Sequence, residues 1–212
     1  RLLLFDMVSQ GVSTDLVLGA TKVMDHALLD FFEGQYQDLQ IRDQPTVSQD
    51  SYLKMAAYRS GALMGCAAQI GALVAGGNKD SQEVCKEAGR KLGLALHLQH
   101  DINEIWDIKQ GSSPVAIVRK SYPVIYAIET APVAVKREIG SLFATRVLDP
   151  RDLPRLVELL DEANARKHST EAVQSAQAAF LSKLAGIGVA QGLLAEFENL
   201  ASYLIQHGVT GD

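Results

Sequence analysis

The sequence predicts an all-α protein. Apolar residues recur every three and four positions along the chain, as they do on one face of a helix, and no segment alternates apolar and polar residues long enough to compete as a strand. Aromatic residues make up only 6% of the 212 residues, while Ala and Leu are frequent, which favours close helix packing. With 47% hydrophobic residues the chain can build one sizeable core, so we expect a single helical domain over residues 1–212.

Capping and breaking residues predict the first two long helices. Ser13-Thr14-Asp15 predicts the start of a helix that runs to about Gln40. After a short connector, Ser48 or Gln49 begins a second helix, which we expect to continue to the glycines that begin at Gly76.

A third long helix follows. Asp80-Ser81 with Glu83 resembles an N-terminal capping signature, and the helical pattern continues past Trp106 to about Lys109. Gly111-Ser-Ser-Pro114 is expected to end it. The remaining helices are predicted over 114–129, 132–147, 152–165, 169–186 and 188–207.

Charge and composition exclude some classes of partner. The net charge is −5, and acidic and basic residues are interspersed, which argues against nucleic acid as a partner. The longest apolar run, Gly61 to Gly77, contains Gln69 and is shorter than the roughly 20 residues that a membrane helix needs, so we predict no transmembrane segment.

The cysteines and the first residues indicate the compartment. Cys66 and Cys85 form no Cys-x-x-Cys pair and have no zinc-finger spacing, so we expect them to be buried, reduced and structural. Residues 1–25 contain no secretory leader pattern, and we therefore expect a cytoplasmic protein.

Acidic and imidazole side chains are placed at helical spacing within an apolar run. His97, Asp101 and Glu104 fall at i, i+4 and i+7, and His100 precedes Glu104 by four residues. These side chains therefore lie along one face of the helix. Such a face could hold a metal ion; the spacing alone fits a solvated stripe on an amphipathic helix as well.

The surrounding sequence, Gly93-Leu-Ala-Leu-His-Leu-Gln-His-Asp-Ile-Asn-Glu-Ile-Trp106, resembles a known family motif. It is similar to the second aspartate-rich region of the trans-isoprenyl diphosphate synthases, the polyprenyl synthetase family. There, Gly-Leu-Ala-Phe-Gln-(Ile/Leu)-x-Asp-Asp-x-x-(Asp/Gly) closes a long central helix.

Three further blocks resemble the same family, in the same order, over residues 28 to about 130. Phe32-Glu-Gly-Gln-Tyr-Gln-Asp38-Leu is similar to Glu-Gly-Gln-x-x-Asp-Leu. Tyr52-Leu-Lys-Met-Ala-Ala-Tyr-Arg59-Ser60-Gly-Ala-Leu is similar to Tyr-x-x-Met-x-x-x-Lys-Thr-x-x-Leu. Arg119-Lys120-Ser121-Tyr122-Pro123-Val is similar to Lys-Lys-(Ser/Thr)-Leu-Pro-Val.

The sequence departs from the family at its most informative positions. Where the family has Asp-Asp-x-x-Asp, this chain has His100-Asp101-Ile-Asn-Glu104, so a single aspartate stands in place. The family's Gln is His97, and its Lys-Thr pair is Arg59-Ser60. Arginine for lysine keeps a cation but replaces a point charge with a planar fork, which also suits a diphosphate.

The resemblance implies an antiparallel helix bundle of the isoprenoid synthase type. The family's first aspartate-rich motif does not occur in these 212 residues, and by comparison with the family Arg1 falls about a third of the way into the fold. We therefore expect the leading helices of the bundle to be missing from this chain. Either the natural protein carries an upstream segment or the chain is a degenerate relative.

The implied function is a magnesium-dependent prenyltransferase. Such an enzyme condenses isopentenyl diphosphate with an allylic diphosphate by ionisation, head-to-tail attack and loss of a proton. Magnesium prefers oxygen ligands, so Asp101 is the first candidate, with Glu104 binding directly or through water. His100 is a poorer ligand, because imidazole suits softer metals, and we expect weaker magnesium binding here than in relatives with both aspartates.

The resemblance also assigns substrate-binding residues. Arg59, Arg119 and Lys120 would bind the diphosphate. Arg119 and Lys120 could equally be ordinary surface cations, whereas Arg59 interrupts a nearly uncharged helix and fits that reading less well. Ser60 and His97 would face the allylic carbon, where family members use Thr and Gln oxygens. A neutral His97 offers a lone pair and a protonated one repels a cation, so activity is expected to fall below about pH 6.5.

Family members usually form homodimers, which we expect here as well.

Two alternatives to this enzyme remain. The altered motif also fits a non-catalytic subunit that regulates an active partner. A terpene cyclase of the same fold ranks last, because Asn103-Glu104 does not reproduce the Asn-Asp-x-x-Ser-x-x-x-Glu pattern of those proteins.

Overall fold

The computed structural model describes residues 2–44, 46–107, 120–143 and 150–207, and every regular element in these ranges is a helix. The all-α prediction is therefore confirmed. The elements are α1 (Leu2–Ser9), α2 (Thr14–Asp43), α3 (Gln49–Arg59), α4 (Gly61–Val74), α5 (Lys79–Trp106), α6 (Tyr122–Thr130), α7 (Val133–Leu142), a short 3-10 helix (Pro150–Asp152), α8 (Leu153–Glu162), α9 (Ala165–Gly186) and α10 (Gln191–His207).

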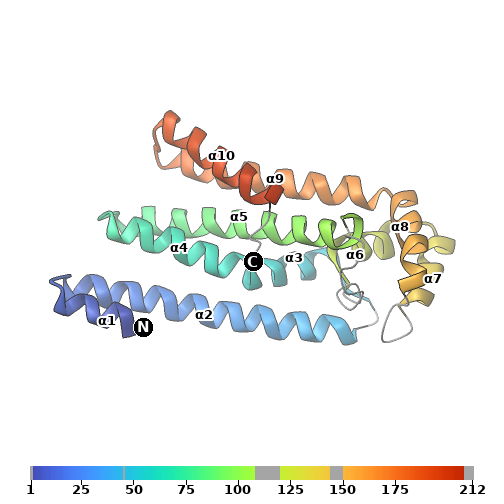
Figure 1. Ribbon diagram of the computed structural model, residues 1–212, viewed down its shortest axis with the longest axis horizontal. Coiled ribbons are helices and arrows are strands. Elements are labelled where there is room, and N and C mark those ends of the chain that lie inside the picture. The colour runs from blue at the N-terminus through green and yellow to red at the C-terminus, as the bar shows by residue number, and fades with distance from the viewer. Residues whose placement is uncertain (1, 45, 108–119, 144–149, 208–212) are drawn as a thin grey trace.

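The long helices lie side by side along the length of the molecule (Figure 1). Helix α5 is central, because it packs against α4 on one side and α9 on the other, and α2 packs against α3 and α4. Helices α6, α7 and α8 gather at one end of the bundle (Figure 1). This end also receives the second half of α5, which carries the acidic motif.

Glycines allow two helix backbones to touch along the α4–α5 contact. A Cβ atom at Gly93 would lie 2.5 Å from the carbonyl oxygen of Ser60, and one at Gly89 would lie 2.4 Å from that of Met64. Only residues without a side chain permit this approach. The junction between α3 and α4 is consequently fixed against the middle of α5.

The structure corrects the predicted second helix, which is interrupted at Ser60. The N–H of Ser60 donates to the carbonyl of Ala56 and ends α3, and the chain begins α4 at Gly61. Ser60 itself has φ −97° and ψ −33°. Within an apolar helical pattern, hydrophobic periodicity gives no signal for such a break.

Other helix boundaries differ by a few residues. Ser13 caps α2 as predicted, by accepting from the amide of Leu16. The cap of α5 is Asn78, which accepts from the amide of Ser81. The helix expected over 114–129 begins only at Tyr122, and its predicted first residues, 114–119, lie outside the described residues.

The apolar side chains form three clusters along the bundle. The largest joins α2, α3, α5, α6 and α9 around Tyr52, Met55 and Leu98. A second, around Leu156 and Leu160, fills the α6–α8 end, and a third joins α5, α9 and α10. The first cluster surrounds the inward side of the acidic motif, so packing there controls the geometry of the site.

The two cysteines are free thiols, as predicted, but they are half-buried rather than fully buried. Burial nevertheless raises the pKa of both the Cys66 and the Cys85 thiol. None of the helices in the described part of the chain combines the length and the apolar character that a membrane span requires.

We expect Gly93→Ala to destabilise the protein by about 1–3 kcal/mol, because the new methyl group overpacks a backbone contact that cannot yield easily. Gly71→Ala, in α4, is the matched control: a Cβ there meets nothing within 4 Å. Better helix propensity should stabilise it by about 0.5–1 kcal/mol. Denaturant unfolding measures both, and equal effects of the two variants would contradict the packing account.

Candidate functional site

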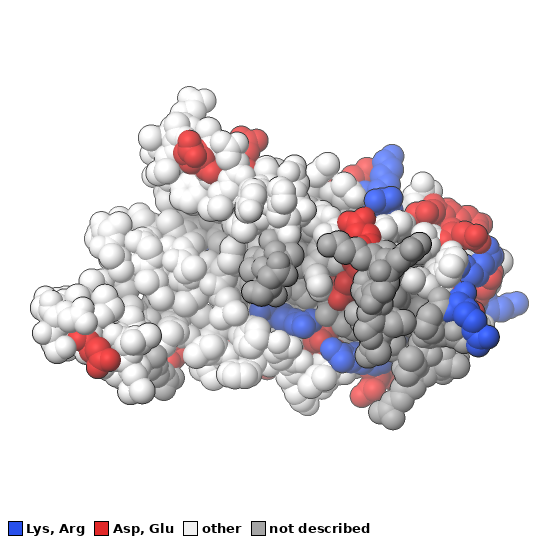
Figure 2. Space-filling view, viewed as in Figure 1, with Lys and Arg blue, Asp and Glu red and all other residues white. Residues whose placement is uncertain are grey.

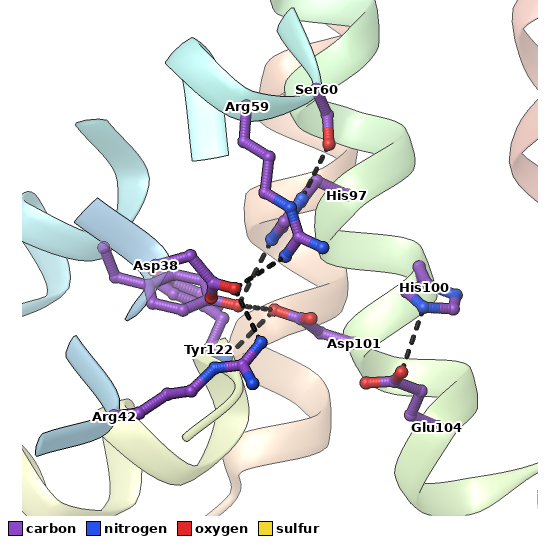
Figure 3. Close-up of polar contacts among 10 residues, drawn as sticks. Asp38, Arg42, Arg59, Ser60, His97, His100, Asp101, Glu104 and Tyr122 are labelled. Atoms are coloured by element: carbon purple, nitrogen blue, oxygen red, sulfur yellow. Dashed lines mark hydrogen bonds and ion pairs between the residues drawn. The ribbon is translucent and has the colours of Figure 1, made fainter. Parts of the chain in front are cut away.

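The acidic motif on α5 is divided between the interior and the surface. His97 is 6% exposed and Asp101 is 0% exposed. The side chain of His100 is 61% exposed, and that of Glu104 is 17% exposed. Figure 3 shows His97 and Asp101 directed toward α3, while His100 and Glu104 lie together on another flank of the helix. The four side chains, which the spacing places on a single face of the helix, therefore lie on two faces.

Asp101 joins three elements of the fold. Its Oδ2 atom accepts a hydrogen bond of 2.6 Å from the hydroxyl of Tyr52 on α3. The same oxygen accepts a 3.0 Å bond from the backbone amide of Tyr122 at the start of α6. Because hydrogen bonds to a buried carboxylate are strong, this carboxylate fixes the ends of α3 and α6 against α5.

Ser60 and His97, which the resemblance assigns to the same substrate carbon, are adjacent in the structure. The Oγ of Ser60 lies 2.7 Å from Nδ1 of His97. The Nε2 of His97 lies 3.3 Å from the hydroxyl of Tyr52, whose ring packs edge-on against the imidazole. Both ring nitrogens of His97 therefore have protein partners, and Ser60, which is half-buried, is the outer member of the pair.

A buried carboxylate with two arginines lies next to this pair. The Asp38 side chain, 5% exposed, is 2.9 Å from Nη2 of Arg42 and 3.3 Å from Nη1 of Arg59. A Cβ atom at Gly34 would lie 2.4 Å from the backbone nitrogen of Arg59, so α2 and the end of α3 are in direct backbone contact. Two guanidinium groups share one carboxylate, which leaves an excess of positive charge.

The cations predicted to bind diphosphate have different positions. Arg59 belongs to the arginine pair described above. Lys120 donates through Nζ to the carbonyl oxygens of Arg42, at 3.3 Å, and of Gln44, at the end of α2. A cation is favoured at a helix C-terminus, so this contact also stabilises α2. Arg119 lies outside the described residues.

Arg42 is a basic residue of the site that sequence reasoning missed. It lies four residues after Asp38, which belongs to a recognised block, and that helical spacing was the available signal. Arg42, Arg59 and Lys120 are linked through Asp38 and the end of α2, and we call these three residues the basic cluster. Figure 2 shows that on the face drawn few charges cover the α1 end of the bundle, whereas Lys and Arg gather nearer α6–α8.

The three predicted metal ligands do not converge. Nε2 of His100 is 3.0 Å from Oε1 of Glu104, on the exposed flank of α5. Asp101 is buried on the other flank. Among the described residues, no group of three or more His, Cys, Asp or Glu side chains is arranged to hold a metal ion. The residues of this motif therefore do not fit a metal site built from all three side chains.

A second polar cluster extends the site toward α9. The hydroxyl of Tyr122 donates to Gln49, at 3.1 Å, and lies 3.2 Å from Nε2 of His168. Tyr126 stacks on the His168 ring with centroids 3.9 Å apart. Burial, with smaller contributions from Glu129 and other nearby groups, raises the pKa of the Tyr122 hydroxyl. Sequence reasoning missed this cluster, because its members lie on three separate helices.

Comparison with known proteins decides the family. The family model described as polyprenyl synthetase matches residues 2–160. The chain belongs to the polyprenyl synthetase family. Family membership agrees with the four sequence blocks and explains why they occur in the family's order.

The curated relatives are prenyl diphosphate synthases. The chain is 30% identical over 170 residues to a geranylgeranyl diphosphate synthase of Mycobacterium tuberculosis, covering 76% of this chain and 48% of the relative. It is also 30% identical over 160 residues to a geranylfarnesyl diphosphate synthase of Aeropyrum pernix, covering 73% and 49%. The chain thus spans about half the length of the curated relatives it matches.

Solved structures confirm the bundle. A crystal structure of geranylgeranyl pyrophosphate synthase aligns with a TM-score of 0.81 at 22% identity, covering 93% of this chain and 63% of that one. A polyprenyl synthase from Caulobacter crescentus, complexed with calcium and isoprenyl diphosphate, aligns with a TM-score of 0.80 at 19% identity, covering 95% and 61%. At these identities the likeness shows the fold.

We predict that Arg42→Gln and Arg59→Gln each weaken binding of inorganic pyrophosphate by about 10- to 100-fold, because each removes charge-assisted hydrogen bonds worth about 1.5–3 kcal/mol. Isothermal titration calorimetry measures the affinity. Arg155→Gln is the control, since Arg155 is bound to Glu138 and Glu158 instead. Equal losses in all three variants would show that general charge, rather than this cluster, binds the anion.

Proposed function

We propose that the protein is a prenyltransferase that condenses isopentenyl diphosphate with an allylic diphosphate into a longer prenyl diphosphate. The observation that carries this proposal is the position of the two arginines bound to Asp38. One of them, Arg59, directly precedes Ser60, which contacts His97, and the chain belongs to this family. Side chains suited to a diphosphate would thus lie beside a group able to face a carbocation.

The arginines would bind the leaving group. Breaking the allylic C–O bond creates pyrophosphate and a carbocation together, so positive charge on the protein favours the transition state. Arg59 and Arg42 supply planar, permanently charged donors that match phosphate oxygens. Asp38 positions them, because each of the two side chains is held on its carboxylate.

Ser60 would stabilise the cation. A hydroxyl oxygen next to an allylic cation offers lone-pair density, and a site closed to water prevents hydrolysis of the cation. Arg59 and Ser60 are adjacent in sequence at the α3–α4 junction. The two side chains proposed to meet the leaving group and the cation therefore start from neighbouring backbone positions.

Magnesium is the cofactor that the family implies, and we propose it for this protein as well. When bound, it would neutralise diphosphate charge. The described residues of the α5 motif do not fit a three-ligand site. The roles proposed for Arg42, Arg59 and Ser60 do not depend on the ion. His100 and Glu104, on the exposed flank, are the members of the predicted set that share one surface.

A second candidate function is supported by the burial of Asp101. The single aspartate of the motif is fully buried and bonded to Tyr52 and Tyr122, so it acts as a structural element. A non-catalytic subunit that regulates an active partner would keep the fold and this bond while losing the metal ligands. Turnover decides between the two candidates.

We also propose that the protein forms a homodimer. Helix α2 presents Leu29, Phe32, Tyr36 and Leu39, which are 67%, 63%, 60% and 57% exposed. Their spacing of three, four and three residues makes one apolar stripe, which suits packing against the same stripe of a second copy. The cytoplasmic location and the single-domain organisation expected from the sequence remain predictions.

Product analysis tests the function directly. The full-length natural protein is incubated with Mg²⁺, isopentenyl diphosphate and either dimethylallyl, geranyl or farnesyl diphosphate, and the products are identified by mass spectrometry. We expect longer prenyl diphosphates, which should not form when EDTA is present. Folded protein that converts none of these substrates would contradict the enzyme and support the regulatory subunit.

Restoring the family's acid tests the exposed flank. His100→Asp should lower the Mg²⁺ concentration that gives half-maximal activity, because a carboxylate beside Glu104 is a better ligand than imidazole. His207→Asp makes the same change near the end of α10 and should have no effect. If magnesium dependence and turnover are unchanged in His100→Asp, His100 does not occupy a ligand position.

A further inference from the structure

We infer that Asp101 acts through Tyr52 to fix the tautomer of His97, and so is a positioning residue. The tautomer in turn orients the hydroxyl of Ser60. The four residues form one chain, with contacts of 2.6 Å, 3.3 Å and 2.7 Å from the carboxylate to the serine (Figure 3).

The Asp101 carboxylate sets the direction of the first hydrogen bond. An ionised carboxylate only accepts hydrogen bonds, and Oδ2 of Asp101 accepts from the backbone amide of Tyr122 and from the hydroxyl of Tyr52. Tyr52 has a single hydroxyl proton, and the 2.6 Å contact uses it. Toward His97, the Tyr52 oxygen can therefore only accept.

The tautomer of His97 follows from this. Its Nε2 atom faces an oxygen that can only accept, so Nε2 must carry the proton. In a neutral imidazole the other nitrogen, Nδ1, then has a lone pair. Ser60 lies 2.7 Å from Nδ1, so the serine hydroxyl donates its proton to the histidine.

The consequence concerns Ser60. Its proton is directed at His97, so its oxygen lone pairs point away from the ring. If the proposed prenyltransferase reaction takes place here, these lone pairs are pre-oriented for a carbocation without any reorganisation. Asp101, Tyr52 and His97 are then positioning residues, and Ser60 is the group that touches the substrate.

The hydrogen bonds that link Asp101 to Ser60 cannot easily rearrange. Tyr52 is 1% exposed and Asp101 is 0% exposed, so no bulk water competes for their hydrogen bonds. The close backbone contact between Gly93 and Ser60 holds the serine over His97, one turn further along α5. If all of these hydrogen bonds ran in the opposite direction, Asp101 would have to carry a proton and the His97 proton would lie on Nδ1.

Nuclear magnetic resonance of the ¹⁵N-histidine-labelled full chain tests this without substrate. The two nitrogens of each ring give distinct shifts according to which one carries the proton, and His97→Gln identifies the signals of His97. We expect protonated Nε2 and unprotonated Nδ1 at neutral pH. A proton on Nδ1, or a fully protonated ring, overturns the inference.

Three variants sharpen the test. In Asp101→Asn the amide oxygen must face the Tyr122 amide, so the acceptor remains and the His97 tautomer should not change. Tyr52→Phe removes the partner of Nε2, and a mixture of tautomers should appear. Tyr36→Phe, at a 60% exposed position, is the control for removing a tyrosine hydroxyl. An unchanged His97 spectrum in the folded Tyr52→Phe variant would contradict the inference that Tyr52 fixes the His97 tautomer.

The link to turnover is tested separately, so that the two proposals can fail independently. Ser60→Ala should reduce turnover about 10²-fold in the natural background, as loss of one oriented polar group does in other active sites, and much less in the Tyr52→Phe background. The same loss in both backgrounds would show that the chain does not orient Ser60. An absence of turnover in every variant would refute the enzyme and leave the tautomer result standing.

Discussion

The direct backbone contact between α5 and the α3–α4 junction is the constraint on which the site depends. Gly93 lies against Ser60, and Gly34 lies against Arg59, so three helices meet at two consecutive residues. No side chain separates their backbones. The break between α3 and α4 at Ser60 lies at this contact, where the serine sits over His97 and Arg59 reaches Asp38 on α2. A looser junction would leave the same residues present but too far apart to act together.

Burial gives the two flanks of α5 different chemistry. On the inward flank, His97 and Asp101 are enclosed by apolar side chains of α3, α6 and α9, where hydrogen bonds are strong and partners are obligatory. On the outward flank, His100 and Glu104 bind each other at the surface. The inward flank therefore determines the geometry of the site.

Helical periodicity and capping residues were enough to predict the all-α bundle and most of its helices, and the family blocks drew attention to Ser60 and His97, which the structure brings together. Spacing could not show which flank of α5 is buried, because residues at i, i+3 and i+4 span about a third of the helix circumference. It also gave no sign of Tyr52 as the link between Asp101 and His97, since these residues come from different helices. Arg42 was missed although its spacing from Asp38 was visible, because no motif drew attention to it.

The central claim is that Asp101 holds the fold of the site while the arginines of the basic cluster meet the diphosphate. The most direct measurement is a crystal structure of the full-length protein with Mg²⁺ and a non-reactive allylic diphosphate analogue. We predict that the diphosphate contacts Arg42 and Arg59 and that the Asp101 carboxylate keeps its bonds to Tyr52 and the Tyr122 amide. An Asp101 side chain released from Tyr52 and coordinated to a metal ion would contradict the account.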